Sequence, residues 1–540
     1  MAQRTVTRIG GHLVAETLEA LGAKVVMGLP GIHALPIWEA LRTSSIRDVA
    51  FRTELAAGFA ADGYARVTGQ PAPLLLSTGP GALISLASLM EAASSHVPVV
   101  AIASQIPGDL IGKGRGYLHE LPDQLASFAP LVKSARRAES TGEIPEVLAE
   151  AWRIARTPPG GPVFVEIPTD LLAGETDATV PELSGSPPPR AVPDEAALAE
   201  ATGLLAGADR PAIWAGGGVL RSEAWAELVA LAERLDAPVA TTYMGKGAIP
   251  EDHPLAVGSG CDEGAMLELL ETADVVLAVG TELGAETTQQ YRLQFPGRLV
   301  QIDAAAERIG ATYPALGLVG DAGATLAALA GRLEPRRADG AARASSVRER
   351  IASGLRNRGE DELELGLLDT IRAALPRDAV HAWDMTILAY CAGAHFPALA
   401  PRRFLYPLGS GTLGYAWSAA LGAKLALPGT AALAVHGDGG VMYGLQELAT
   451  ARQHHIAAKL LIVDDGAYGI LREYQEDAFG ATHSVDLVQP DFASLSAAYG
   501  VPAREATPES LGDTLTWAFA IDGPAVVVLR TKLHWIRPTV

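Results

Sequence analysis

The sequence predicts an α/β protein of three doubly wound domains, each built on a parallel sheet. A chain of 540 residues is longer than a single hydrophobic core usually serves. Short runs of Val, Leu, Ile and Ala, bounded by Gly or Pro, alternate with amphipathic helical segments along its whole length. Continuous apolar runs of this kind are typical of strands that are buried on both faces of a parallel sheet.

Two stretches interrupt this alternation and predict the domain boundaries. PELSGSPPPRAVPDEA, from Pro181, is rich in Pro and Ser, and LEPRRADGAARASSVRER, from Leu333, is charged and has few large apolar residues. We interpret both as linkers. The chain then divides into domains at 1–182, 195–332 and 350–540, each of an ordinary size for a domain.

Each domain has its own candidate strands. In chain order they are PAPLLLSTGPG, VPVVAIASQ and GPVFVEIP, then RPAIWAGGG, ADVVLAVGTE and RLVQID, then AALAVHGDGG and KLLIVDDG. Most of them end in turns that contain Gly or Asp. Ligands of doubly wound domains bind at the carboxyl ends of the strands, so we expect the functional residues in these turns.

Composition restricts the possible partners. The net charge of −20 and the pI near 5.1, without a compensating Lys/Arg cluster, argue against nucleic acid. No apolar run reaches the ~18 residues of a membrane span, and the N-terminal segment lacks the apolar core of a signal peptide. Cys261 and Cys391 show no metal-type spacing and are expected to be reduced thiols. These features predict a cytoplasmic protein that acts on small molecules, without membrane or nucleic-acid partners.

The GDGG turn at 437–440 follows one candidate strand, and its glycines would let backbone N–H groups approach a phosphate. Asp438 would then bind a cation. The next candidate strand ends in Asp464 and Asp465. If the two strands are neighbours, Asp438 and Asp465 converge, and one Mg²⁺ shared with a diphosphate fits such a pair. Each turn alone is also compatible with an ordinary connection.

This arrangement resembles the thiamine diphosphate fingerprint of the pyruvate oxidase, acetolactate synthase and 2-oxo acid decarboxylase family. The resemblance implies a pyrimidine-binding domain, a central domain and a diphosphate-binding domain, in that order. It also implies Mg²⁺ bound by the side chains of Asp438 and Asp465 and by the backbone carbonyl of Ala467. The chain departs from the family at Asp464 and Asp465, where most members have an Asn pair, and the departure adds negative charge.

An enzyme of this kind needs a carboxyl group beside the pyrimidine ring, in an apolar pocket that raises its pKa. The segment FRTELAAGFAADGYARVTGQPAPLLLSTGPGA resembles the family segment that supplies it, with Glu54 as the catalytic residue. Thr53 stands where many members have His. The alternative is an exposed glutamate that is favoured by the dipole at a helix start.

Two histidines in Gly-containing loops, His33 and His119, resemble the proton-handling positions of carboligases similar to benzaldehyde lyase. Either could instead be an incidental loop residue. The segment PLGSGTLGYAW resembles the family loop that supports the bent cofactor. The full set of residues expected to bind the cofactor is Pro30, Thr386, Gly411, Leu413, Gly437, Gly439, Gly440 and Tyr468.

The expected substrate pocket is largely apolar and suits an apolar or aromatic acyl chain better than a highly charged one. It consists of Tyr117, Leu118, Ile470, Leu471 and Tyr474. In the central domain the GGG turn lacks a full dinucleotide-binding spacing, and the FAD stretches of acetolactate synthases are not matched, so FAD is doubtful.

We therefore expect a thiamine diphosphate- and Mg²⁺-dependent carbon–carbon lyase or carboligase that acts on 2-oxo acids with aldehyde or ketone acceptors, similar to acetolactate synthase. The alternatives are a 2-hydroxyacyl-CoA lyase or benzaldehyde-lyase-like enzyme, a catalytically silent homologue, and a nicotinamide oxidoreductase using the central domain. In the family the site lies between subunits, which implies a homodimer or homotetramer.

Overall fold

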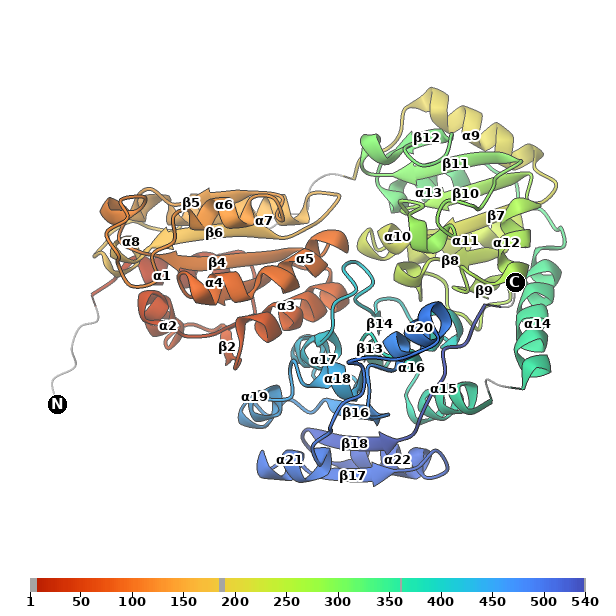
Figure 1. Ribbon diagram of the computed structural model, residues 1–540. Coiled ribbons are helices and arrows are strands. Elements are labelled where there is room, and N and C mark those ends of the chain that lie inside the picture. The colour runs from red at the N-terminus through yellow and green to blue at the C-terminus, as the bar shows by residue number, and fades with distance from the viewer. Residues whose placement is uncertain (1–6, 184–189, 360–361, 539–540) are drawn as a thin grey trace.

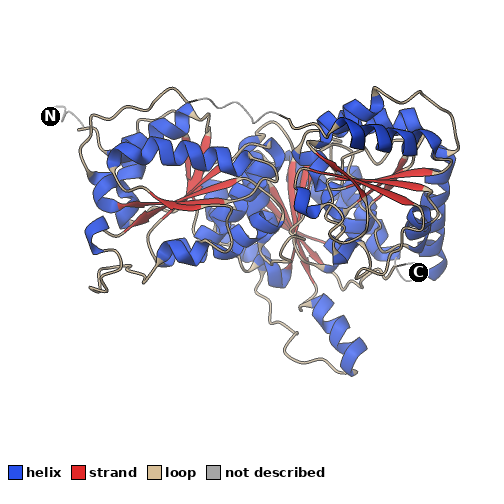
Figure 2. Ribbon diagram, turned by 90° about the horizontal axis from the view of Figure 1, so that it is seen from above, coloured by secondary structure: helices blue, strands red, loops and turns tan. Residues whose placement is uncertain are grey.

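The computed structural model describes residues 7–183, 190–359 and 362–538 and confirms the predicted fold class (Figure 1). Three six-stranded sheets follow one another along the chain, and their strands pair in parallel. Helices cover both faces of each sheet (Figure 2). Part of the first predicted linker, 184–189, lies outside the described residues.

The N-terminal sheet has the strand order β2-β1-β3-β4-β6-β5. Its strands are β1 (Val25–Gly28), β2 (Arg47–Ala50), β3 (Ala72–Leu76), β4 (Val99–Gln105), β5 (Ala135–Arg137) and β6 (Val163–Pro168). Its helices are α1 (Gly10–Ala20), α2 (Leu35–Leu41), α3 (Glu54–Thr68), α4 (Pro80–Ile84), α5 (Leu86–Ser94), α6 (Gln124–Phe128), α7 (Ile144–Arg156) and α8 (Thr169–Ala173). The predicted strands of this domain are thus confirmed as β3, β4 and β6.

The central sheet has the order β12-β11-β10-β7-β8-β9. Its strands are β7 (Pro211–Ala215), β8 (Val239–Thr241), β9 (Ala256–Gly258), β10 (Val275–Val279), β11 (Arg298–Asp303) and β12 (Leu316–Val319). Its helices are α9 (Glu195–Gly207), α10 (Gly217–Arg221), α11 (Trp225–Leu235), α12 (Gly264–Glu271) and α13 (Ala322–Ala330). Two further helices, α14 (Gly340–Arg358) and α15 (Glu362–Ala374), lead to the last domain.

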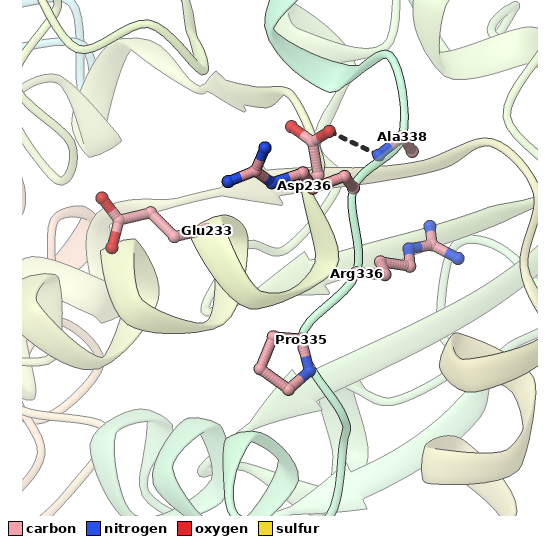
Figure 3. A pocket seen from close by; sticks show the side chains of 6 residues that line it. Glu233, Asp236, Pro335, Arg336 and Ala338 are labelled. Carbon is pink, nitrogen blue, oxygen red and sulfur yellow. Dashed lines mark hydrogen bonds between the residues drawn. The ribbon is translucent and has the colours of Figure 1, made fainter.

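The second predicted linker is therefore wrong in its conformation, because α14 occupies most of it. Although α14 contains many charged residues, it is amphipathic, and Ala344, Val347 and Leu355 are buried. Only the stretch before α14 is extended. There the backbone N–H of Ala338 donates to Asp236, at the end of α11, across the mouth of a cavity of about 570 Å³ (Figure 3). All the residues that line this cavity lie in α11, just after it, or in 335–338, away from the predicted site residues.

The C-terminal sheet has the order β14-β13-β15-β16-β18-β17. Its strands are β13 (Val380–Trp383), β14 (Phe404–Leu405), β15 (Ala432–Gly437), β16 (Lys459–Asp464), β17 (Ala503–Ala506) and β18 (Ala525–Arg530). Its helices are α16 (Ile387–His395), α17 (Tyr415–Ala426), α18 (Asp438–Val441), α19 (Glu447–Gln453), α20 (Gly469–Phe479), α21 (Phe492–Ala498) and α22 (Leu511–Ala520). Turns separate α18, which contains most of the GDGG turn, from α19.

In each sheet the strand order reverses between two neighbouring strands: β1 and β3, β7 and β10, β13 and β15. Loops that leave such a pair diverge and open a crevice for ligands. The first and third crevices contain predicted site residues. In the central domain a β-carbon at Gly218 would lie 2.5 Å from Cα of Gly280, so its Gly-rich turn serves close backbone packing. The low expectation for FAD stays a prediction.

Helices α3 and α17 join the N-terminal and C-terminal domains in one continuous apolar core. A β-carbon at Gly63 would lie 2.2 Å from the carbonyl oxygen of Ala419, and one at Gly422 would lie 1.8 Å from that of Ala60. Gly63 of α3 contacts Ala419 of α17, and the earlier residue Ala60 contacts the later residue Gly422. The two helices therefore run antiparallel. Small residues allow this close approach.

Replacing Gly422 by Ala is expected to destabilise the protein by about 1–3 kcal/mol, because the added methyl group must push the two helices apart. The matched control is Gly203→Ala in α9, where a β-carbon meets nothing within 4 Å. That change should stabilise by up to about 1 kcal/mol. Urea denaturation midpoints test both, and equal midpoints for Gly422→Ala and wild type would contradict the close packing.

His395, near the end of α16, is buried with Nε2 3.6 Å from Oε1 of Glu263, and burial lowers its pKa to about 4. In the unfolded chain the His395 imidazole has a pKa near 6.5 and so binds a proton more readily than in the folded protein. The folded state therefore loses stability as the pH falls below about 6.5. We expect a loss of about 2 kcal/mol at pH 5 that His395→Gln removes. Denaturation midpoints at pH 5 and 7.5 for both proteins measure it; identical pH dependence would refute it.

No helix among the described residues is both long and apolar enough to cross a membrane. Cys261 and Cys391 are buried, and neither forms a disulfide with a described cysteine.

Candidate active site

The GDGG turn lies where β15 ends, beside the start of α16. A β-carbon at Gly437 would lie 2.9 Å from Oγ1 of Thr386, and one at Gly439 would lie 2.5 Å from the ring of Tyr468. At Gly440 it would lie 2.1 Å from a carboxylate oxygen of Asp384. Side chains are therefore excluded at all three glycines, and the predicted residues Thr386 and Tyr468 form the walls of this backbone cradle.

The two predicted metal-binding carboxylates converge, because β15 and β16 are paired neighbours. Oδ2 of Asp438 accepts hydrogen bonds from the N–H of Gly466 at 2.8 Å and from Nε2 of Gln489 at 2.6 Å. Burial, together with the nearby charge of Asp465, raises the pKa of Asp438 to about 7, and burial also raises the pKa of Asp465. A divalent cation between the two would relieve this repulsion.

Ala467 follows directly, and its N–H donates to Oδ1 of Asp465 at 3.2 Å. Asp464, in contrast, turns toward Arg530 of the neighbouring strand, with Nε 3.6 Å from Oδ2. Asp464 therefore has an ion-pair partner of its own, whereas Asp465 adds negative charge beside Asp438 where an Asn would be neutral.

Asp384 is a functional candidate that the sequence did not single out. Fully buried after β13, it accepts the N–H groups of Gly414 at 3.2 Å and Tyr415 at 2.8 Å, and it lies 3.0 Å from Nδ1 of His436. It thereby fixes the end of the loop that contains Leu413. An acidic residue directly after a buried strand was the available signal. Gly411 in this loop has a φ of +66°, which favours glycine.

Glu54 is the first residue of α3, with 5% of its surface exposed. Burial raises its pKa, as expected for a carboxyl group that must stay protonated beside a ring nitrogen. A β-carbon at Gly81 would lie 2.8 Å from its Oε1, so the turn after β3 covers the carboxyl group. Thr53, in the position of the family's His, caps α3 by accepting the N–H of Ala56 at 3.2 Å.

His33 and His119, the two predicted proton-handling residues, lie beside each other. Their ring centroids are 5.4 Å apart, and the ring of Tyr117 is 5.8 Å from His33. Nδ1 of His33 lies 3.0 Å from Oγ1 of Thr78, in the same turn that covers Glu54. Burial, then the neighbouring His119, lowers the pKa of His33, so its neutral form dominates at pH 7.

A buried polar network that sequence reasoning missed supports this turn. Oε1 of Gln124 accepts the N–H of Gly79 at 2.7 Å, and its Nε2 donates to Glu166 at 3.0 Å. Glu166 is also paired with Arg137 at 2.6 Å. Nothing in the local pattern around Gln124 indicated this contact. Pro30, predicted to meet the cofactor, follows β1 at the same crevice and is exposed.

The chain therefore carries two half-sites: the N-terminal half-site around Glu54 and His33, and the C-terminal half-site around Asp438. Asp62, on α3, accepts a hydrogen bond from Tyr415 beside the C-terminal half-site, but just over two turns of α3, about 12 Å, separate it from Glu54. Among the described residues no hydrogen bond or ion pair links Glu54 to Asp438.

The predicted substrate residues are divided in the same way. Tyr117 and Leu118 are exposed on a loop of the N-terminal domain. Leu471 and Tyr474 are exposed on α20 of the C-terminal domain, where the ring of Tyr474 packs edge-on against Trp535, 5.8 Å away. The exception is the fifth residue, Ile470, which is buried in the C-terminal core. The described residues show no hydrogen bond or ring contact between the two groups.

The C-terminal half-site fits a diphosphate with a divalent cation. The glycines leave the backbone at 437–440 without side chains of its own, and the two carboxylates are of the donor type that Mg²⁺ prefers. The N-terminal half-site supplies the desolvated carboxyl group that an aminopyrimidine requires.

Comparison with known proteins agrees with this geometry. Three family profiles match: thiamine pyrophosphate enzyme, N-terminal TPP binding domain, over residues 8–127; central domain, over 198–329; and C-terminal TPP binding domain, over 384–529. A protein of Pseudomonas aeruginosa named "Probable 2-ketoarginine decarboxylase AruI" is 38% identical, over 98% of this chain and 94% of its own.

Acetolactate synthases are also similar. The probable large subunit from Methanocaldococcus jannaschii is 32% identical over 95% of this chain and 90% of its own, and large subunit IlvB1 from Mycobacterium tuberculosis is 33% identical over 96% and 87%. The profiles span all three domains and the similarity extends along nearly the whole chain. The protein accordingly belongs to the thiamine pyrophosphate enzyme family and is a thiamine diphosphate-dependent enzyme.

Proposed function

We propose that this enzyme decarboxylates a 2-oxo acid with thiamine diphosphate and Mg²⁺. One combination of residues carries the proposal. The N-terminal half-site contains the buried Glu54 and the neighbouring His33 and His119, and the C-terminal half-site contains the converging Asp438 and Asp465 carboxylates beside the GDGG turn. The similarity to a protein named as a decarboxylase favours this reaction. Carboligation is the second candidate, supported by the similarity to acetolactate synthases.

When bound, thiamine diphosphate supplies a carbon acid that adds to the substrate carbonyl and accepts the electrons released with CO₂. Asp438, Asp465 and the carbonyl of Ala467 bind Mg²⁺, and the glycine cradle with Thr386 and Tyr468 holds the diphosphate. The loop with Gly411 and Leu413 orients the ring system.

Burial raises the pKa of Glu54, which favours the protonated carboxyl group that would hydrogen-bond to a ring nitrogen of the aminopyrimidine. His33 is neutral near pH 7 and can accept or donate a proton at the reacting carbonyl, with His119 beside it. His33 contacts Thr78, which precedes the residue that covers Glu54, Gly81, by three positions. Tyr117 and Leu118 from one half-site, with Leu471 and Tyr474 from the other, would enclose the acyl chain.

The separation of the half-sites within one chain supports a homodimer, or a dimer of such dimers, in which Glu54 of one copy faces Asp438 of the other. Light scattering tests the assembly, and a monomeric active species would overturn it.

A substrate panel tests the reaction. The panel should include pyruvate, branched and aromatic 2-oxo acids and 2-oxo-5-guanidinovaleric acid, with and without aldehyde acceptors, and products should be identified by mass spectrometry. CO₂ with an aldehyde supports decarboxylation, and a longer hydroxyketone supports carboligation. Release of CoA from 2-hydroxyacyl-CoA, or cleavage of benzoin, would instead support the lyase alternatives. No product from any member would overturn the proposal.

A further inference from the structure

Three ionisable side chains of the N-terminal domain form one buried network, which we call the Asp62–Arg66–Glu91 network. Nε of Arg66 lies 2.6 Å from Oδ1 of Asp62, and Nη2 of Arg66 lies 2.7 Å from Oε1 of Glu91. Both carboxylates are fully buried, and the Arg66 side chain is 9% exposed. One guanidinium thus stands between two carboxylates, one on α3 and one on α5.

The network contacts both ends of the segment 406–415 of the C-terminal domain. This segment includes the Gly411 loop, the loop with Gly411 and Leu413 that is proposed to orient the cofactor. At its start, Nη1 of Arg66 donates to the carbonyl oxygen of Tyr406 at 3.2 Å. At its end, the hydroxyl of Tyr415 donates to Oδ1 of Asp62 at 2.7 Å. The contacts cross from the N-terminal to the C-terminal domain of the same chain.

Glu91 fixes the middle of the segment. Its Oε2 accepts both the backbone N–H and the hydroxyl of Ser410, each at 2.7 Å, and its Oε1 accepts the hydroxyl of Ser95 at 2.7 Å. A β-carbon at Gly409 would lie 2.5 Å from Oγ of Ser95. The residue that follows Ser410 is Gly411, with its positive φ. The backbone of 409–411 thus packs closely against the end of α5, and the Glu91 side chain holds it there by accepting hydrogen bonds from Ser410.

Such a network is a costly way to gain stability alone. Desolvation of three charges offsets most of their mutual attraction, and replacing a buried ionic cluster with apolar residues is often neutral or stabilising. Buried charges with all hydrogen bonds satisfied do, however, fix one geometry, since any other arrangement leaves a charge unpaired. The contacts at the start, middle and end of one functional loop indicate where this fixed geometry is used.

We propose that the Asp62–Arg66–Glu91 network is a positioning device that sets the backbone of the Gly411 loop for the cofactor, with Glu91 as its principal residue. The inference rests on the proposed function, in which this loop orients the cofactor's rings. The contacts of the buried Glu91 carboxylate are with Arg66, Ser95 and Ser410, so it would act through the loop backbone. Its loss should therefore be measured in cofactor affinity.

The test uses the full-length protein and measures thiamine diphosphate dissociation constants by calorimetry at saturating Mg²⁺. Glu91→Gln and Ser410→Ala are each expected to weaken binding about tenfold. Both changes break the same contact, the one between Glu91 and Ser410. The double variant should therefore bind thiamine diphosphate at most about twofold more weakly than whichever single variant binds it less tightly. Glu251→Gln is the matched control: it also neutralises a carboxylate paired with a buried cation, Lys246, and should bind within about twofold of wild type.

Melting temperatures without cofactor separate positioning from folding. If Glu91→Gln and Ser410→Ala bind the cofactor like wild type and lose only melting temperature, the network is merely structural and the proposal is overturned. Should Glu91→Gln not fold, Ser410→Ala, which removes a single hydroxyl, decides the question alone. Failure of the wild type to bind thiamine diphosphate would overturn the proposed function as well, so the two failures are distinguishable.

Discussion

Glu54→Gln should slow turnover by about 10²- to 10⁴-fold while leaving thiamine diphosphate affinity within a few-fold of wild type. The amide has the size of the carboxyl group and preserves packing under Gly81, but it cannot exchange a proton with a ring nitrogen as a carboxyl group can. Hydrogen–deuterium exchange at the cofactor's C2 position, measured alongside turnover, isolates the activation step from substrate binding.

The control for this change is Glu39→Gln, which neutralises an exposed carboxylate paired with Arg42 in the same domain. It should leave exchange and turnover unchanged. A Glu54→Gln exchange rate indistinguishable from that of wild type would remove Glu54 from its assigned role.

Asp438→Asn is expected to weaken Mg²⁺-dependent cofactor binding by at least about 100-fold, since one of the two carboxylate ligands is lost and the amide is a weaker oxygen donor. The adjacent Asp464→Asn is a stringent control, because it removes a neighbouring carboxylate that pairs with Arg530. It should bind within about threefold of wild type. Calorimetric titrations with and without Mg²⁺ measure both, and equal losses in the two variants would contradict the assignment of Asp438 as the ligand.

The two inactive variants also test the shared site. If Glu54 of one copy serves Asp438 of the other, coexpressed Glu54→Gln and Asp438→Asn chains form mixed dimers with one intact site. Random pairing makes half of the dimers mixed, so about a quarter of wild-type activity should return. If both residues served the same chain, no activity would return.

The sequence by itself determined the features that depend on neighbouring residues. Apolar runs bounded by turns identified the buried strands, and the GDGG and Asp464–Asp465 turns fell at their carboxyl ends as predicted. Glu54 could be placed at the start of an Ala-rich helix. Strand burial, turn chemistry and helix starts are local properties, so a single chain records them directly. The charged stretch before the last domain was misread because its few buried residues are spread over the long helix α14.

Only the tertiary structure decided what lies beside what. Three contacts join residues that are distant in sequence. Asp384 accepts a hydrogen bond from Tyr415, Gln124 accepts one from Gly79, and Asp464 pairs with Arg530. These relations depend on how sheets and domains pack, and packing partners far apart in a chain leave no local pattern in either segment.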